Sequence, residues 1–189
     1  MVRALMQFED TAIAGVRIIR PKRHQDARGF FSEILRDDVF KANGLSDSFV
    51  QENVSRSTAA GTLRGLHFQL APKAQAKLLR VTQGAILDVA VDLRKSSPTF
   101  GKHVAIELSA DNGTLFYVPA GCAHGFVTLQ PNSEVAYKVT DYWSAEHERG
   151  LLWNDTALGI AWPFTQEQVT ITPRDASYPT LSDLRDTFA

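Results

Sequence analysis

Apolar and polar residues alternate with a period of two over most of the chain that follows Phe49. The pattern is clearest in residues 87–94 and 103–109, and such alternation is typical of half-buried β-strands. Turn-forming residues interrupt it roughly every ten positions, a spacing typical of sandwiches and barrels. The sequence therefore predicts an all-β fold, a jelly-roll β-barrel or sandwich with a few short helices.

The remaining segments are shorter. Residues 16–20 are β-branched and stop at Pro21, and residues 29–33 regain strand character, so both are expected to be strands. The polar segment 21–29 between them is expected to be a loop. Residues 37–43 predict a helix of about two turns, which an aspartate caps and Gly44 ends. Residues 145–150 predict a helical turn.

We interpret residues 1–189 as a single jelly-roll domain with an N-terminal strand arm and a C-terminal surface tail after Pro163. The formal net charge of −1 argues against nucleic acid and anionic membranes as partners. Cys122 is the only cysteine, and its small neighbours favour a buried, unreactive thiol over a nucleophile. No signal peptide and no apolar run of about 18 residues is recognisable, so a cytoplasmic protein is expected.

Two polar side chains share strand faces with apolar ones. Lys77 alternates with Leu79 and Val81, and Tyr137 alternates with the valines two residues to either side of it. A buried ammonium group is costly unless it is paired or faces a wet cavity, which the mouth of a barrel supplies. The alternatives are a lysine that extends along the surface to solvent and a core tyrosine with a satisfied hydroxyl.

The stretch from Leu63 to Lys77 adds His67, which can take up a proton near neutral pH. Arg64 lies on the opposite parity, so both side chains reach one pocket only if Gly65 marks a bulge. A structural histidine is the alternative.

Residues 119–124 read P-x-G-x-x-H, which resembles the second signature of the cupin small-barrel superfamily. Metal-binding cupins supply H-x-H from a partner segment, but the comparable segment here is His67-Phe68-Gln69. Zinc and iron normally require three or four protein ligands, and His24, His103 and His147 lie in polar sequence. We therefore expect no metal and plain acid–base chemistry.

Several motifs in one order resemble the dTDP-4-dehydrorhamnose 3,5-epimerase family over about residues 10–180. They are D-A-R-G-F-F-S-E (26–33), Q-E-N-V-S-R-S (51–57), L-R-G-L-H-F-Q (63–69), Q-A-K-L (75–78), V-D-L-R-K-S-S-P-T-F-G (91–101), P-A-G-C-A-H-G-F (119–126), Y-K-V-T-D-Y-W (137–143) and W-N-D (153–155).

The resemblance implies a jelly-roll homodimer, no cofactor, and a dTDP-linked 4-keto-6-deoxyhexose that is inverted at C3 and C5. It also implies the catalytic roles. His67 matches the base that removes a hydrogen α to the ketone, and Asp175 matches the carboxylate that orients it. Lys77 matches the cation near the C4 oxygen, and Tyr137 matches the acid that returns a proton to the opposite face.

The residues implied in substrate binding follow from the same resemblance. Arg28, Arg64 and Arg174 suit the pyrophosphate, and the amides of Gln51 and Asn53 suit the nucleotide or sugar. An aromatic side chain stacks on thymine, for which Trp143 is favoured over Tyr142. The family exchanges N-terminal strands, so Arg28 and Glu33 are expected to serve the site of the neighbouring subunit. The set is Arg28, Phe31, Glu33, Gln51, Asn53, Arg64, His124, Tyr142, Trp143, Glu148 and Arg174.

Two positions depart from the family pattern: 174 is arginine where lysine is common, and 143 is tryptophan where tyrosine is common. Both keep the charge or the aromatic face, so they bear on the fit of the nucleotide. The alternative functions are an epimerase that acts at only C3 or C5 in a modified-sugar pathway, a non-catalytic cupin that binds a nucleotide sugar, and a metal-dependent cupin oxygenase.

Overall fold

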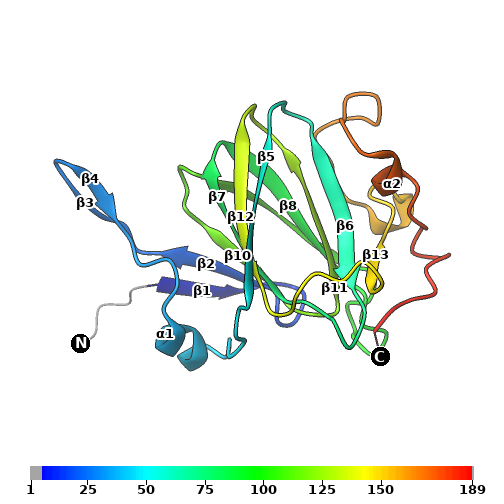
Figure 1. Ribbon diagram of the computed structural model, residues 1–189, viewed down its shortest axis with the longest axis horizontal. Helices are drawn as coiled ribbons and strands as arrows, with labels where there is room; N and C mark the ends of the chain where they lie inside the picture. The colour runs from blue at the N-terminus through cyan, green and yellow to red at the C-terminus, as the bar shows by residue number, and fades with distance from the viewer. Residues whose placement is uncertain (1–5, 189) are drawn as a thin grey trace.

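Two antiparallel sheets face each other in the computed structural model, which describes residues 6–188 (Figure 1). The larger sheet contains, in spatial order, β1 (Met6–Asp10), β2 (Arg17–Pro21), β10 (Leu115–Val118), β7 (Lys77–Gln83), β12 (Ser133–Val139) and β5 (Gln51–Ser57). The smaller contains β13 (Glu148–Gly150), β6 (Leu63–Gln69), β11 (Cys122–Thr128), β8 (Ala85–Asp92) and β9 (His103–Ser109). The predicted all-β, cupin-like jelly roll is confirmed.

A separate hairpin, β3 (His24–Asp26) and β4 (Gly29–Phe31), projects away from the two sheets (Figure 1). The expectation of a loop over residues 21–29 was therefore wrong in part, because β3 lies within it. Its residues are exposed and polar and carry no apolar alternation. The sequence pattern alone could not reveal a strand of this kind.

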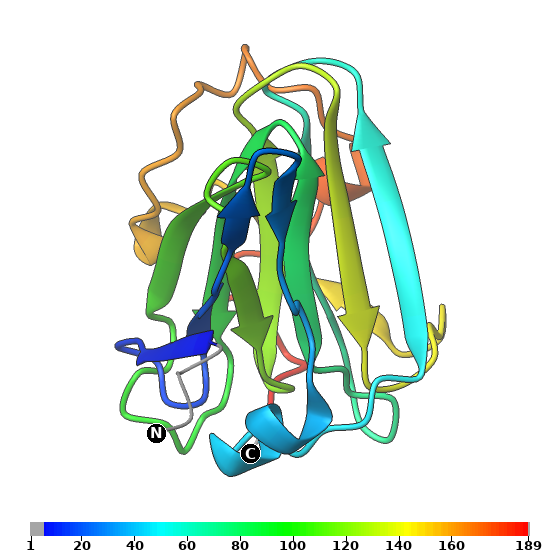
Figure 2. The same cartoon turned by 90° about the vertical axis from the view of Figure 1, so that its left-hand side faces the viewer.

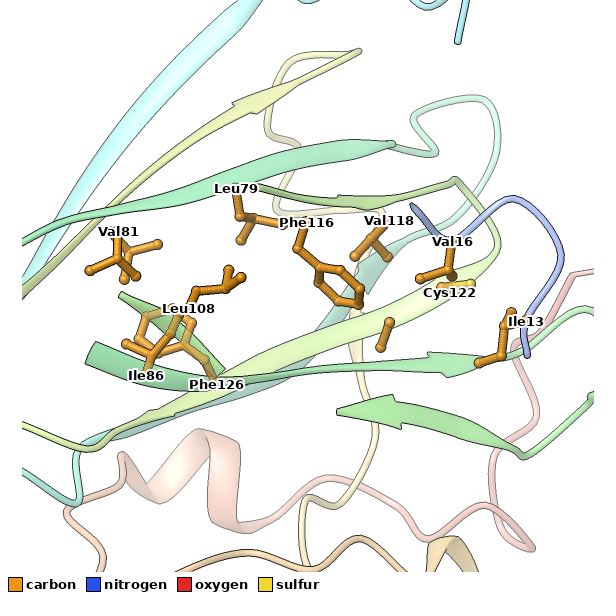
Figure 3. Close-up of a cluster of buried hydrophobic side chains, with 12 residues drawn as sticks. Ile13, Val16, Leu79, Val81, Ile86, Leu108, Phe116, Val118, Cys122 and Phe126 are labelled. Atoms are coloured by element: carbon orange, nitrogen blue, oxygen red, sulfur yellow. The ribbon is translucent and has the colours of Figure 1, made fainter. Parts of the chain in front are cut away.

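The core between the sheets combines alternate residues of facing strands (Figure 3). Leu79 on β7 and Phe116 on β10 come from the larger sheet, and they meet Ile86 and Phe126 from the smaller one. Cys122 is also buried there, and burial raises the pKa of its thiol to about 12. A thiol with this pKa stays protonated, as the unreactive interpretation requires.

The outer face of the smaller sheet is also buried, because the C-terminal segment packs against it. Leu181, Leu184 and Phe188 join a second cluster with Val89 and Val91 of β8. The tail therefore forms a structural layer and carries the short helix α2 (Pro173–Ala176), and the 3₁₀ helix η1 (Thr156–Leu158) precedes it.

This second layer corrects the interpretation of β8 as a half-buried strand. Val89 and Val91 face the C-terminal segment, so Asp88 and Asp92 lie on the inner side and are fully buried. Alternation reports two different faces, but it does not report which of them meets solvent.

Helix α1 (Asp37–Ala42) confirms the helix predicted over residues 37–43 and lies at one end of the larger sheet (Figure 2), but its N-cap residue is Arg36, so the expected aspartate cap was wrong. Phe40 of this helix packs with Leu45, Leu78 and Tyr117 on the outer face of that sheet. Residues 145–147 form a turn that the Glu148 N–H closes by donating to the Ser144 carbonyl at 3.0 Å, so the predicted helical turn is present, but it ends where β13 begins and does not extend to residue 150. No helix among residues 6–188 is long and apolar enough to cross a membrane.

Candidate active site

A cavity of about 750 Å³ opens between the two sheets at the end where the C-terminal segment crosses β6. Both sheets and that segment supply its walls. The residues that sequence analysis singled out and that line it are Arg64, His67, Lys77, His124, Tyr137, Trp143, Glu148, Arg174 and Asp175. Residues distant in sequence are thus brought to one site.

His67 and Asp175 form a hydrogen-bonded pair. The Nε2 atom of His67 lies 2.9 Å from Oδ1 of Asp175, whose Oδ2 accepts a bond from the Gly65 backbone N–H at 3.2 Å. Burial acts to raise the pKa of Asp175, but the bond and charge of His67 outweigh it and hold that pKa below its ordinary value. An ionised carboxylate only accepts, so Nε2 carries the proton and Nδ1 keeps its lone pair.

The backbone of α2 places Asp175 beside His67. The hydroxyl of Thr172 accepts the Asp175 N–H at 3.2 Å and so caps the helix, and Pro173 occupies its first turn. Both features are typical of helix starts. These capping residues are recognisable in the sequence. The pairing of Asp175 with His67 is not, because the two residues are 108 positions apart in the chain.

Strand β6 is irregular at Gly65, as the alternation suggested. The pairing of β11 with β6 shifts register between His124 and Phe126. Gly65 has φ of +125°, and a Cβ there would lie 2.6 Å from the Gly125 Cα. Only glycine allows both this backbone and this close approach. The strand is therefore irregular at Gly65, the condition under which the sequence allowed one pocket to contain both side chains, and Arg64 and His67 do line one cavity.

Lys77 reaches the cavity from β7, where its Nζ lies 3.4 Å from the His67 carbonyl oxygen. Burial lowers the pKa of Lys77 to about 8, and the nearby charges of Glu148 and Asp88 oppose this change. The ammonium group is therefore mostly protonated at neutral pH. Such a group can stabilise negative charge on a bound oxygen.

Tyr137 on β12 faces the cavity from the sheet opposite His67. Burial raises the pKa of its phenol; Arg64 acts to lower it and Glu148 to raise it. The phenol thus holds its proton at neutral pH. A proton acceptor and a proton donor therefore meet one cavity from different sheets.

His124 forms a second histidine–carboxylate pair, which sequence analysis missed. Its Nε2 atom lies 2.6 Å from Oδ1 of Asp88, and both side chains are buried. Burial lowers the pKa of His124 although the charge of Asp88 opposes this. The only sequence signal that Asp88 points inward was that it shares a face of β8 with Ile86 and Ala90. The other face of the strand is equally apolar, so this signal did not select Asp88.

Gln51, Asn53 and Trp143 line a smaller recess of about 80 Å³, which also touches His67 and Lys77. Gln51 joins the other two, because its Nε2 donates to Asn53 Oδ1 at 2.8 Å and its Oε1 accepts the Trp143 N–H at 3.1 Å. These groups are arranged as an extension of the main cavity.

An ion pair joins Arg174 and Glu148 at the wall of the main cavity, with 2.5 Å between Nη2 and Oε2. Arg64 is held by weaker bonds, as its Nε donates to Ser57 Oγ at 3.3 Å. Both guanidinium groups therefore present positive charge to the cavity.

Four predicted residues line neither the main cavity nor the smaller recess of their own chain. Arg28 and Phe31 belong to the projecting hairpin and are exposed, and Glu33 follows it and is half-buried. Tyr142 is 61% exposed and contributes only its carbonyl oxygen, which accepts a bond from Gln69. Of the two adjacent aromatic residues, only Trp143 faces the cavity.

Among residues 6–188, no group of three or more histidine, cysteine, aspartate or glutamate side chains is arranged to hold a metal ion. His24 and His147 lie away from the cavity, and His103 bonds to the Leu158 carbonyl at 2.9 Å.

Comparison with known proteins gives consistent matches. The family model described as dTDP-4-dehydrorhamnose 3,5-epimerase matches residues 10–183. A protein of that name from Sinorhizobium fredii is 50% identical over 183 residues, which cover 97% of this chain and 93% of the relative.

Solved structures agree with these sequence matches. A dTDP-6-deoxy-D-glucose-3,5-epimerase from Legionella pneumophila, in complex with dTDP-4-keto-L-rhamnose, superposes with a TM-score of 0.89 at 43% identity, covering 96% of this chain and 95% of that one. A 3′-monoepimerase from Streptomyces bikiniensis, in complex with dTDP-quinovose, has a TM-score of 0.84 at 33% identity, covering 92% and 87%.

Proposed function

This chain belongs to the dTDP-4-dehydrorhamnose 3,5-epimerase family, and on that premise we propose how its residues invert C3 and C5 of dTDP-4-dehydro-6-deoxy-D-glucose. The chain is an epimerase of the isomerase class, and its substrate is a dTDP-linked sugar. The roles of the individual side chains are our proposal.

The first step is removal of a hydrogen from the carbon next to the C4 ketone. Nδ1 of His67 takes the proton, since Asp175 occupies Nε2, and the C–H electron pair moves to form the enolate. Asp175 then stabilises the imidazolium. Lys77 stabilises the negative charge on the C4 oxygen, because its ammonium group faces the same cavity.

The second step is return of a proton from the other side of the sugar. The phenol of Tyr137 donates it, which forms the new C–H bond with inverted configuration and leaves a phenolate that solvent reprotonates. The His67 imidazolium loses its proton to solvent, and the same two steps then invert the other carbon. The observation that carries the proposal is that His67 and Tyr137 line one cavity from opposite sheets. A sugar ring between them meets base and acid on its two faces.

Binding of the nucleotide follows from charge and shape. Arg64 and Arg174 are proposed to bind the pyrophosphate, and Trp143 to stack on thymine, since aromatic side chains stack on bases. His124 and Glu148 are proposed to contact the sugar. Gln51 and Asn53 supply amides from the smaller recess.

The hairpin is proposed to complete the site of a second copy in a homodimer. Phe30 and Phe31 are 55% and 67% exposed on a hairpin that stands apart from the sheets (Figure 1). Exposed apolar side chains on a projecting segment are typical of an interface. Arg28 and Glu33 then reach the neighbouring cavity.

The expected cytoplasmic location also stays a prediction, which cell fractionation checks.

Proton NMR of the keto sugar nucleotide in heavy water tests this mechanism. The wild type should exchange hydrogen at C3 and C5. His67→Ala should abolish both exchanges, and Tyr137→Phe should slow net inversion more than exchange. Tyr142→Phe is the matched control, because that phenol lies outside the cavity. Retained exchange in His67→Ala would remove His67 as the base.

The second candidate is an epimerase that acts at one carbon. The structural similarity to a 3′-monoepimerase favours this candidate, because one fold supports inversion at one carbon as well as at two. Exchange and inversion at only one carbon in the same NMR experiment would select it over the double epimerase.

A further inference from the structure

Tyr178 lies directly after α2 and packs against the base assigned above. The centroids of its ring and the His67 ring are 5.8 Å apart, and the two planes meet at 81°. This is the edge-to-face arrangement that aromatic pairs favour. Asp175 bonds to Nε2 of the same imidazole. The His67 ring is therefore held both by a hydrogen bond and by the aromatic ring of Tyr178.

Gly150 makes room for this ring. It pairs with His67 across β13 and β6, and a Cβ built on it would lie 2.2 Å from Cε2 of Tyr178. No real side chain tolerates such a distance, so the tyrosine ring occupies the space that any other residue at 150 would fill. The glycine is required here for its missing side chain.

The backbone after Tyr178 is tied to the strand end that carries Gly150. The Pro179 carbonyl accepts the Leu152 N–H at 2.8 Å, and the Leu181 N–H donates to Oδ2 of Asp155 at 2.7 Å. The ring is thus fixed from both ends of a short segment, and its position does not depend on its own hydroxyl. That hydroxyl is buried and has no hydrogen-bond partner among the described residues.

We propose that Tyr178 is a positioning residue for the reaction, which uses the space left by Gly150 to hold the imidazole of His67 in the orientation set by Asp175. The inference rests on the role proposed for His67. Tyr178 does not line the cavity, so it acts through the histidine and not on the sugar. The part that acts is the ring.

Two substitutions separate the ring from the hydroxyl. Tyr178→Phe keeps the ring and should retain kcat within about twofold. Tyr178→Leu removes the aromatic face and should lower kcat on the order of tenfold, since small misplacement of a catalytic group costs this much or more. KM should change little in Tyr178→Phe, because the binding residues keep their contacts. In Tyr178→Leu it should rise only modestly, since the Arg174 guanidinium, 5.9 Å from the ring centroid, loses that cation–π contact while its ion pair with Glu148 remains. A wild-type kcat in Tyr178→Leu would overturn the proposal.

A double-mutant cycle with Gly150 tests the packing itself. Gly150→Ala in the wild-type background should displace the ring and lower kcat as Tyr178→Leu does. In the Tyr178→Leu background the same change should cost little more, because no ring remains to displace. Strictly additive losses would show that the two residues act independently and would refute the inference.

If a variant is less stable, NMR of the His67 ring still tests the proposal, because the folded protein gives its own ring signals. Tyr178→Leu should shift the ring signals and Tyr178→Phe should not; an unchanged His67 spectrum in the leucine variant would count against positioning. The two proposals fail separately. Retained exchange in His67→Ala refutes the mechanism, whereas normal turnover in Tyr178→Leu with an inactive His67→Ala refutes only the role of Tyr178.

Discussion

Oδ1 of Asp88 lies 2.6 Å from Nε2 of His124, which lines the cavity. Its Oδ2 atom is buried and has no hydrogen-bond partner among the described residues. The carboxylate thus orients one cavity histidine, and its negative charge also favours the protonated form of Lys77. One buried side chain therefore supports two residues of the site.

Asp88→Asn should lower kcat at least about tenfold, because the amide can donate to Nε2 and select the wrong tautomer of His124. Steady-state kinetics with the keto sugar nucleotide provide the measurement. Asp111→Asn, an exposed substitution, serves as the control. Equal kcat values for the two variants would contradict the role of Asp88.

Lys77 should set the alkaline limit of activity. Its pKa of about 8 means that the ammonium form predominates below pH 8 and is lost as the pH rises through that value. We expect kcat/KM to fall above about pH 8 as the charge that stabilises the enolate disappears. Lys77→Arg should remove this limb, since a guanidinium keeps its proton. A limb that is unchanged in the arginine variant would assign it to another group.

Trp143 should contribute to nucleotide affinity and not to turnover. Trp143→Ala should raise the Kd for dTDP about tenfold, in the range measured for base–aromatic stacking, with little change in kcat. Trp143→Tyr should restore most of the affinity. Tyr142→Ala is the matched control, since its exposed ring lies outside the cavity. Titration calorimetry with dTDP would exclude the stacking role if both alanine variants bound alike.

Asp92 should make the fold sensitive to acid. Burial acts to raise its pKa, but Arg94, Ser97 and Thr99 donate hydrogen bonds to it and lower that pKa to about 2. The folded pKa is below the unfolded one, so the carboxylate stabilises the protein above about pH 4, and this contribution is lost as the pH falls toward 2.

Asp92→Asn should therefore reduce the free energy of unfolding by about 2 kcal/mol at pH 7 and by much less near pH 2. Urea denaturation at the two pH values measures the difference, with the exposed Glu146→Gln as the control. A pH-independent loss would mean that packing, and not ionisation, explains the defect.

The proposed exchange of hairpins makes a prediction about mixed dimers. Arg28→Ala and His67→Ala should each be inactive, but a heterodimer of the two should regain activity, because one of its sites contains neither substitution. If each site were built from one chain, both sites would carry a defect and mixing would restore nothing. Sedimentation analysis of Phe31→Ser should also show weaker self-association.

Much of the fold was predictable because it follows from local alternation. The strands of the barrel and α1 depend on residues close together in sequence. The residues now grouped in the cavity were found largely through ordered motifs, and the structure places nine of them around one space. Their catalytic and binding roles stay predictions.

The errors have a common physical cause. β3 is exposed and polar and β13 is very short, so no apolar periodicity marks either strand, and β13 pairs with the distant strand β6. Asp88 is buried because the larger sheet covers its face of β8 while the C-terminal layer covers the other face, and the packing of Tyr178 depends on a glycine in a distant strand. None of these contacts has a local signal.

The sequence alone determined that this chain forms an all-β barrel and which family its motifs resemble, since strand periodicity and ordered motifs are properties of neighbouring residues. Only the tertiary structure decided which charges are buried and which side chains meet. Burial and contact arise when segments far apart in the chain pack together, so they have no counterpart in the order of the residues.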